Sequence, residues 1–437
     1  MKYYHLFDNY YYLPDYKCFV STISLIECVK LPSEFTSLFT DIQHSASNNE
    51  RSLLATSAYL ILSDICNLQC SYCYSSASTE GRLMSLEIAK SVVRFVVRNA
   101  IIKKFAGVPH AVVINYMGGG EPTINWKVIE NITYYARDLC KKHSLPCYIG
   151  IQTNGQLNSD DRIYWLFSNL DKVGLSLDGL SDIQNIHRPR CDGMSSFLPA
   201  SRFIDIHKQY KNVKFTVRST VSSISLIHLR EFCDWLAQNN VSKLHIEPLS
   251  ICGRALKSGI HPPLYNDFVD EYELLKETYA NNLNISTSMD YDILHNSWLC
   301  SGYLGNAVFV NTNGDMTCCT EVTNPTDKDF SRYCIGKVDE ENVHYYNDAI
   351  KLMNDISLDK CKECFLYNSC NNCVIRYERE KHDKNENYTC LIKQELALRA
   401  FKRLLTMSEY IYMKHKIAKV AINKDGIINL YFLTNAQ

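Results

Sequence analysis

The stretch that decides the fold is Ala58-Tyr59-Leu60-Ile61-Leu62, which runs into Cys66-Asn67-Leu68-Gln69-Cys70-Ser71-Tyr72-Cys73. An apolar segment of strand length leads into a loop with three cysteines in the spacing C-x3-C-x2-C. Thiolates are soft ligands that suit iron–sulfur clusters or zinc. Because a 4Fe–4S cluster normally takes four thiolates, three in one tight loop leave one iron open for another ligand. A structural zinc knuckle and buried thiols are the alternatives.

Five further apolar segments have the length of buried strands, and helix-period stretches lie between them. A strand followed by a helix, six times over, predicts parallel strands joined by right-handed crossovers. We therefore expect an α/β fold with a partial (β/α)6 TIM-like barrel; a flat doubly wound sheet is the alternative. Either fold places the active site at the carboxyl ends of the strands. The predicted strands are residues 58–62, 111–117, 148–153, 172–177, 214–221 and 243–248; the predicted helices are 85–105, 127–143, 160–170, 197–210, 225–238 and 265–281.

Composition limits the partners and the compartment. Lys+Arg is 46 and Asp+Glu is 47, so the near-zero net charge offers no electrostatic case for nucleic acid. The first twelve residues lack the pattern of a signal peptide, and charged residues interrupt the most apolar stretches, so no membrane partner is expected. We expect a cytoplasmic protein, in which thiols stay reduced and the clustered members of the 19 cysteines indicate metal or redox chemistry.

The sequence pattern divides the 437 residues into four parts. Residues 1–55 form a strand-rich block, with strands expected at 3–7, 10–13 and 17–23. Residues 56–285 carry the barrel, and residues 286–395 are rich in cysteines and turns. Residues 396–437 hold the end of a helix expected at 391–414 and a hairpin with strands at 417–422 and 427–432.

Three more motifs follow predicted strands. Met117-Gly118-Gly119-Gly120-Glu121-Pro122 comes after the second strand; its glycines let the backbone approach a ligand closely, and with Glu121 they could hold an α-amino group. Gln152-Thr153-Asn154-Gly155 follows the third strand, and Ser176-Leu177-Asp178-Gly179 follows the fourth. His187, Arg188 and Arg190 come shortly afterwards. An ordinary strand-end turn is the alternative reading of each motif.

These motifs together resemble the signature of the radical S-adenosylmethionine (SAM) enzymes. The resemblance implies that Cys66, Cys70 and Cys73 hold a 4Fe–4S cluster whose fourth iron binds SAM. It also implies the partial (β/α)6 barrel. Polar residues after the third and fourth strands would contact the ribose and carboxylate of SAM, and the end of the sixth strand would line the adenine pocket. The cofactor contacts that the resemblance implies are Tyr72, Gly118, Gly119, Gly120, Glu121, Asn154, Ser176, Arg188, Arg190 and Ile246.

The later cysteines resemble a SPASM domain, a C-terminal extension that holds auxiliary iron–sulfur clusters. The carrying motifs are Cys361-x2-Cys364-x5-Cys370 and Gly314-x4-Cys319. The spacing from Cys370 to Cys373 is one residue shorter than the usual C-x3-C, and a zinc ribbon on Cys361, Cys364, Cys370 and Cys373 is the alternative. The resemblance implies one cluster on Cys361, Cys364, Cys370 and Cys390, and another on Cys300, Cys319 and Cys373 with Cys318, Cys334 or a substrate atom as fourth ligand.

The resemblance implies an enzyme that takes one electron from an external donor such as flavodoxin or ferredoxin. It would cleave SAM and use the 5′-deoxyadenosyl radical to abstract hydrogen. The interpretation we favour is oxidative cross-linking of a ribosomally made precursor peptide through C–C, C–O or thioether bonds. Anaerobic sulfatase maturation, small-molecule dehydrogenation and a non-enzymatic electron carrier are alternatives. In sulfatase-maturing relatives an Asp directly follows the auxiliary-domain cysteine; here Thr320 and Glu321 follow Cys319, so Glu321 is the candidate base.

The N-terminal block bears on the choice of substrate. Its tyrosine-rich strands look like the start of many peptide maturases, and a leader peptide can bind such strands by strand addition around residues 3–23. A tyrosine-rich hairpin packed on the barrel is the alternative.

Overall fold

The computed structural model of the chain describes residues 53–290, 300–302, 304–346 and 348, then 361, 364–366, 370, 373, 375–377, 379 and 387–415, and the backbone of the terminal strands. The chain divides into two compact units. We call residues 51–288 with 301–355 the barrel unit, and residues 1–50, 289–300 and 356–437 the second unit.

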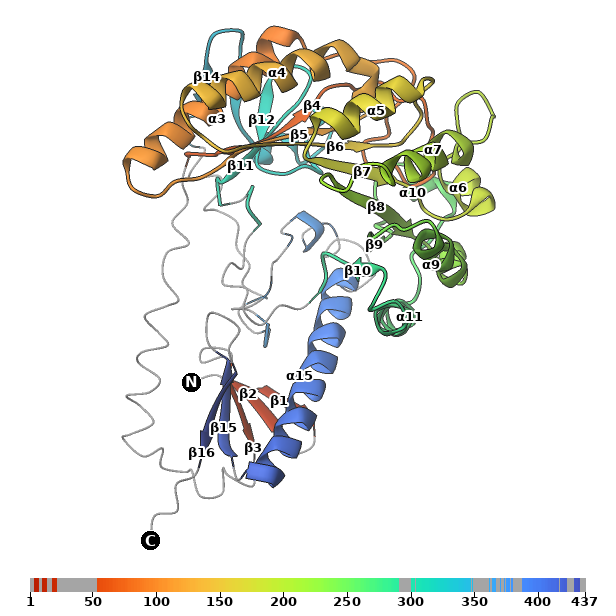
Figure 1. The fold of residues 1–437 in the computed structure, drawn as a ribbon, viewed down its shortest axis with the longest axis vertical. Helices are drawn as coiled ribbons and strands as arrows, with labels where there is room; N and C mark the ends of the chain where they lie inside the picture. The colour runs from red at the N-terminus through yellow and green to blue at the C-terminus, as the bar shows by residue number, and fades with distance from the viewer. Residues whose placement is uncertain are drawn as a thin grey trace. The chain divides into compact units, whose positions relative to one another are not determined.

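The barrel unit is built on six parallel strands that lie side by side in chain order (Figure 1). Each predicted strand is found within one residue of its predicted ends, which confirms the α/β barrel interpretation. The six strands are β4 (Ser57–Ile61), β5 (Val112–Met117), β6 (Cys147–Thr153), β7 (Lys172–Ser176), β8 (Lys214–Val221) and β9 (Lys243–Pro248).

The same sheet continues beyond both edges of the barrel. The strand β10 (Asn284–Ser286) pairs in parallel with β9, and β11 (Ala307–Val310) pairs in parallel with β4. The sheet then adds three antiparallel strands, β12 (Asp315–Thr317), β13 (Cys334–Val338) and β14 (Val343–Tyr345). The sequence groups residues 301–355 with the later cysteines, whereas the structure makes them part of the barrel unit.

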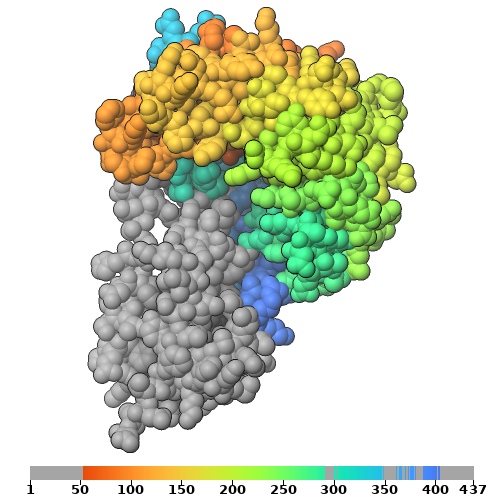
Figure 2. All heavy atoms as spheres, viewed as in Figure 1, coloured from red at the N-terminus to blue at the C-terminus, as the bar shows by residue number. Residues whose placement is uncertain are grey.

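Helices cover the outer face of the sheet, and their surface forms the orange-to-yellow part of the space-filling view (Figure 2). Every predicted helix is present, but the one expected at 225–238 is two helices because Ser222 starts a separate turn with a capping box to Ser225. The helix α6 (Ser181–His187) was not predicted. The others are α3 (Leu86–Phe105), α4 (Trp126–Lys142), α5 (Asp160–Asn169), α7 (Phe197–His207), α8 (Ser223–Leu226), α9 (Leu229–Gln238), α10 (Ala255–Ser258), α11 (Tyr265–Thr278) and α12 (Phe330–Tyr333), with a 3-10 turn η2 (Pro122–Asn125).

Alternation along the strands separates an outer and an inner face. In β5 the side chains of Val112, Ile114 and Tyr116 are buried, whereas Asn115 and Met117 between them are only partly buried. Side chains two apart point to one side of a strand, so the buried set faces the helices and the other set faces the inside of the barrel. The inner face therefore carries the residues that are able to meet a ligand.

The second unit holds both ends of the chain. The three predicted strands are present as β1 (Tyr4–Phe7), β2 (Tyr10–Leu13) and β3 (Cys18–Ser21), and they form an antiparallel sheet in that order. The helix α15 (Tyr388–His415) precedes the predicted hairpin of β15 (Ile417–Ile422) and β16 (Ile428–Phe432). Within this unit β15 lies against β3. None of the helices in the described part of the chain is long and apolar enough to cross a membrane.

Helix α7 gives a test of how the barrel unit is packed. Phe203 is fully buried beside the ring of Phe167, with ring centroids 6.2 Å apart, whereas Leu198 on the same helix is 66% exposed. We expect Phe203→Ala to lower the free energy of unfolding by about 3–5 kcal/mol through loss of burial and the cavity left behind. The control Leu198→Ala should change it by less than about 0.5 kcal/mol. Urea unfolding measures both, and equal effects would contradict the packing described.

Candidate active site

The cysteine loop follows β4 and lies along the segment that comes after α6. The backbone N–H of Gln69 donates to the carbonyl of Pro189 at 2.8 Å, and the N–H of Ser71 donates to the carbonyl of His187 at 2.9 Å. Leu68 and Arg190 form a further antiparallel bridge. Residues more than a hundred positions later in the chain therefore fix the backbone of the cysteine loop from Leu68 to Ser71.

The three thiols of this loop lie close enough to influence one another. Burial raises the pKa of Cys66 to about 12 and that of Cys70 to about 11; Cys70 and Cys73 add to the increase at Cys66, and Cys73 adds to it at Cys70. The sulfur of Cys66 accepts from the N–H of Leu68 at 3.4 Å and from Nδ2 of Asn154 at 3.7 Å. Polar groups therefore already point at the sulfur atoms, as they do around thiolates that bind a cluster.

In the part of the chain that the structure describes, no three His, Cys, Asp or Glu side chains are placed to hold a single metal ion. This does not conflict with a 4Fe–4S cluster, because a cluster binds each thiolate through a different iron and so holds its ligands farther apart. Three partly buried thiols on one loop, two of them with N–H donors beside the sulfur, fit such a cluster.

The glycine motif packs directly beneath the cysteine loop. The N–H of Gly120 donates to the carbonyl of Ser63 at 2.7 Å, and the N–H of Glu121 donates to that of Ile65 at 2.8 Å. A Cβ atom at position 120 would lie 2.1 Å from the oxygen of Ile65, so only glycine permits this approach. The carbonyl of Gly118 accepts from the hydroxyl of Tyr74 at 2.9 Å. The hydroxyl of Ser75 donates to the carbonyl of Gly119.

Glu121 joins two of the turns that follow the strands. Its buried carboxylate accepts from the N–H of Thr123 at 3.1 Å, from the hydroxyl of Thr153 at 2.7 Å and from the N–H of Asn154 at 2.8 Å. Burial raises the pKa of Glu121, while these hydrogen bonds oppose the increase. Both oxygens of Glu121 accept hydrogen bonds from the protein and tie the turn after β5 to the turn after β6. The carbonyls of Gly118 and Gly119 likewise accept from Tyr74 and Ser75, and the contact of this turn with the amino group of SAM stays a prediction.

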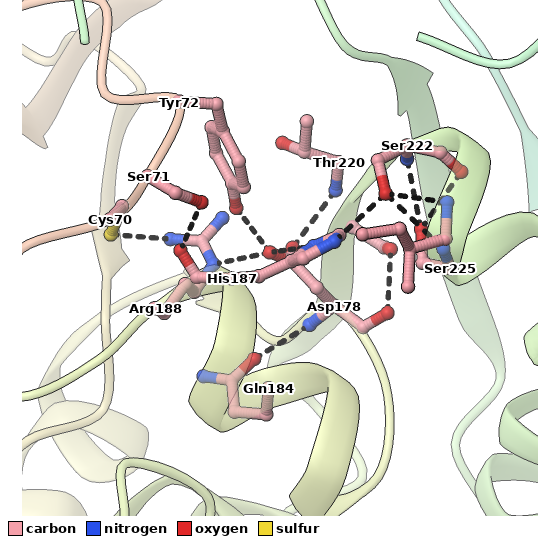
Figure 3. Close-up of polar contacts among 12 residues, drawn as sticks. Cys70, Ser71, Tyr72, Asp178, Gln184, His187, Arg188, Thr220, Ser222 and Ser225 are labelled. Atoms are coloured by element: carbon pink, nitrogen blue, oxygen red, sulfur yellow. Dashed lines mark hydrogen bonds and ion pairs between the residues drawn. The ribbon is translucent and has the colours of Figure 1, made fainter. Parts of the chain in front are cut away.

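A buried carboxylate, Asp178, joins the cysteine loop to the strand ends (Figure 3). It accepts from the hydroxyl of Tyr72, from Nε of Arg188 at 2.9 Å and from the N–H of Thr220 at 2.9 Å, and Nδ1 of His187 lies 3.3 Å away. Burial alone would raise the pKa of Asp178, but the Arg188 guanidinium and His187 hold it well below its usual range. Asp178 is thus an ionised hub, and the sequence analysis did not list it although it quoted its motif.

The structure gives the two predicted arginines different surroundings. Arg188 turns inward, toward Asp178 and the sulfur of Cys70, whose Sγ lies 4.0 Å from Nη1. Arg190 donates to Oε1 of Gln156 at 2.9 Å and forms an ion pair with Asp192. Ser176, at the end of β7, accepts from Nε2 of Gln152 at 2.8 Å. Arg190 and Ser176 stand at the mouth of the barrel, where they remain the proposed contacts of the SAM carboxylate and ribose.

The loop after β9 closes the far side of the cysteine loop. Arg254 donates from Nη1 to the carbonyl of Cys70 and from Nη2 to that of Ala77, each at 2.7 Å. Gly253 has φ +53°, and a Cβ atom there would lie 2.4 Å from the oxygen of Cys73. Sequence analysis missed both residues, because the contact exists only after the barrel brings residues 70 and 254 together.

On the inner face, β9 and β10 carry a histidine relay. Nε2 of His245 lies 2.7 Å from Oε1 of Glu247, and Nδ1 lies 3.1 Å from the hydroxyl of Ser286. The hydroxyl of Ser288 donates to the other oxygen of Glu247 at 2.8 Å. The side chain of Ile246 between them is fully buried and points the other way, so only its backbone can border the adenine pocket predicted there.

The later cysteines fall in both units. Cys318, Cys319 and Cys334 belong to the barrel unit, whereas Cys300, Cys361, Cys364, Cys370, Cys373 and Cys390 belong to the second unit. Nζ of Lys393 lies 3.9 Å from the sulfur of Cys370, and Nε2 of Gln394 lies 3.6 Å from that of Cys364. Because both donors and Cys390 lie in the first turns of α15, the structure brings three of the four predicted ligands of one auxiliary cluster to the same helix end.

Glu321 lies near the cysteine loop. Burial raises the pKa of Tyr74, and the charges of Cys73 and Glu321 add to the increase. Since Tyr74 also contacts the glycine motif, the segment after β12 reaches the site where SAM is expected.

Residues 60–235, which include the three-thiol loop, match the Radical SAM superfamily, so the chain contains a radical SAM domain. Its cofactors are accordingly a 4Fe–4S cluster and SAM. The recognition made from the motifs is confirmed.

The chain is similar to known proteins over most of its length. A cysteine-type anaerobic sulfatase-maturating enzyme of Clostridium perfringens is 24% identical over 369 residues, which are 79% of this chain and 96% of that protein. The solved structure of native anSMEcpe with bound AdoMet has a TM-score of 0.59 at 20% identity and covers 81% of this chain and 99% of that one. Streptococcus suis SuiB bound to precursor peptide SuiA has a TM-score of 0.54 at 17% identity and covers 82% and 79%. At these identities the solved structures establish the fold alone.

Removal of the cysteine loop ligands tests the metal centre. We expect the triple variant Cys66→Ala, Cys70→Ala, Cys73→Ala to lose about four irons per chain and all cleavage of SAM, while the later cysteines keep the remaining iron. Adding Cys361→Ala should remove part of that remainder. The control Cys233→Ala, a buried thiol on α9, should keep the full iron content. Iron analysis and 5′-deoxyadenosine assays measure the result, and continued cleavage by the triple variant would refute the assignment.

Proposed function

We propose that this radical SAM enzyme modifies a ribosomally made precursor peptide by oxidative cross-linking of its side chains. The observation that carries the proposal is the small antiparallel sheet β1–β2–β3, which belongs to a unit other than the barrel. Among the described residues β1 has one partner strand, β2, so its other edge offers N–H and C=O groups to an extended peptide. The likeness to SuiB, solved with a precursor peptide, is consistent with such a substrate.

A second candidate, anaerobic sulfatase maturation, has comparable support. The Clostridium perfringens enzyme matches this chain over 96% of its own length. Burial raises the pKa of Tyr74 and the charge of Glu321 adds to the increase, which supports Glu321 as the candidate base, although Thr320 separates it from Cys319. The two candidates differ in the fate of the substrate's sulfur. Cross-linking removes only hydrogen, whereas oxidation of a cysteine to formylglycine removes its sulfur.

When bound, the cluster and SAM supply a radical that removes a hydrogen atom from an unactivated carbon. The chain holds the parts in place. Arg188, Arg254 and the backbone of residues 187–190 orient the cysteine loop, and the glycine carbonyls present acceptors for an amino group. The buried outer faces of the strands exclude water from beneath the site.

Oxidative bond formation also releases a proton and an electron. The electron would pass to an auxiliary iron–sulfur cluster on the later cysteines, and we propose that His245 takes the proton by way of the Ser286 hydroxyl, which lies 3.1 Å from Nδ1. Its Nε2 faces Glu247, so that carboxylate orients the ring. Both side chains are only partly buried, at 17% and 16% exposed, on the inner face of the barrel.

The substrate class is tested by co-producing the chain with the peptide encoded by a short neighbouring reading frame. We expect mass spectrometry to show loss of hydrogen with sulfur retained. Deleting residues 1–9, which removes β1 but leaves β3 against β15, should sharply reduce modification while substrate-free SAM cleavage persists. A cysteine-containing sulfatase peptide is the comparison. Its conversion to formylglycine, with the neighbouring peptide untouched, would favour the second candidate.

Replacement of the relay tests the proton acceptor. We expect His245→Gln to retain substrate-dependent formation of 5′-deoxyadenosine but to lower product yield by about 10²-fold or more, since general-base catalysis contributes at least that much. Glu247→Gln should have a smaller effect in the same direction. Ser57→Ala, on the inner face of β4, serves as the control for a polar change without the relay. Equal loss of 5′-deoxyadenosine and product would instead indicate a role in binding.

A further inference from the structure

Arg188 lies against the cysteine loop and not in the solvent-facing part of the site. Its side chain is 12% exposed and points away from solvent. The guanidinium lies 5.4 Å from the ring centroid of Tyr72 and, through Nη1, 4.0 Å from the sulfur of Cys70. Both neighbours belong to the cysteine loop, and Cys70 is one of its three thiols.

A hydrogen bond to a buried carboxylate fixes the orientation of this guanidinium. Nε of Arg188 donates at 2.9 Å to Asp178, a carboxylate that also accepts from Tyr72 and from the backbone N–H of Thr220. His187, next in the chain, contacts Asp178 and is anchored through Nε2 to the hydroxyl of Ser222 at 2.9 Å. Figure 3 shows these groups converging from three strand ends on one carboxylate. Arg188 is thereby held toward the sulfur atom.

Arg190 provides the contrast two residues later. Its guanidinium pairs with Asp192, which is 47% exposed, and with Gln156, and neither group belongs to the cysteine loop. The sequence suggests the same role for both arginines. The structure separates them: Arg190 pairs with Asp192 and Gln156, whereas Arg188 lies against the Cys70 sulfur.

A permanent positive charge beside a ligand sulfur has a definite electrostatic effect. Arginine keeps its proton in proteins, so this charge is always present. Reduction adds one negative charge to an iron–sulfur cluster, and net charge and hydrogen bonds to the sulfurs are among the factors that set its reduction potential. In a buried site the attraction is stronger than in water. The cation therefore favours the reduced form.

We propose that Arg188 is a positioning residue of the first cluster, which raises the cluster's reduction potential through its charge at the Cys70 sulfur, and that it is not a ligand of SAM. The inference rests on the cysteine loop holding the cluster and is independent of which substrate the enzyme modifies. Arg188 makes and breaks no bond; the electron still comes from the external one-electron donor.

The test is a redox titration of the reconstituted full-length protein, followed by electron paramagnetic resonance. Only the signal that changes when SAM is added is analysed, because that signal belongs to the first cluster. We expect Arg188→Gln to make reduction at least tenfold less favourable, which is a fall of about 59 mV for one electron. Arg188→Lys keeps the charge without the planar fork and should recover most of the potential.

Two further variants control for impaired folding and for the loss of an arginine elsewhere in the barrel unit. Arg188→Gln leaves Asp178 without its cation, which can impair folding. The double variant Asp178→Asn with Arg188→Gln removes both charges and should have a potential between those of the wild type and Arg188→Gln. Arg137→Gln removes a comparable arginine, paired with Asp171 at 3.1 Å at the opposite ends of the strands, and should leave the potential unchanged.

SAM affinity separates the two roles for Arg188. In equilibrium binding with SAM alone, Arg188→Gln should stay within about threefold of the wild type, whereas Arg190→Gln should bind SAM at least tenfold more weakly. An unchanged potential in Arg188→Gln, or in the double variant where the single one does not fold, overturns the proposal. Loss of SAM binding alongside an unchanged potential would return Arg188 to the role that the sequence suggests.

Discussion

One buried carboxylate holds the site together. Asp178 stands at the end of β7, and its oxygens bind a side chain of the cysteine loop, a backbone N–H at the end of β8 and the guanidinium that follows α6. An uncompensated ion at this depth would be costly, so the carboxylate and its partners stabilise the protein only as a set. The position of the cysteines depends on this set, because the loop has little regular structure of its own.

The barrel turns this local set into a site. Parallel strands bring their carboxyl ends to one edge, so loops that are distant in sequence meet there. Strand alternation sends apolar side chains outward and leaves Gln152, Ser176, His245 and Glu247 on the inner face. Chemistry that relies on a cofactor requires such a scaffold, because the protein supplies binding, orientation and charge and the cofactor supplies reactivity.

The sequence predicts well what depends on local pattern. Six apolar runs of strand length identify the barrel, and the cysteine spacing identifies its metal loop. Each of these signals is contained in a few consecutive residues. The sequence predicts poorly those features that depend on tertiary contacts. Helix α6 is short and mostly polar, so no apolar stripe reveals it. Asp178 and Arg254 acquire their contacts from partners 106 and 184 positions away, and the side chain of Ile246 faces away from the inner side because side chains alternate along a strand.

The hydrogen bonds from Arg254 to the carbonyls of Cys70 and Ala77 have a consequence for biosynthesis. The chain emerges from the ribosome amino end first, so the three cysteines appear long before residue 254 exists. Until β9 and the turn after it are made, Arg254 cannot close the far side of the cysteine loop, and the three thiols stay open to solvent. Iron–sulfur assembly on this loop is therefore a late event that waits for the whole barrel, and oxygen has its best opportunity to damage the protein during synthesis.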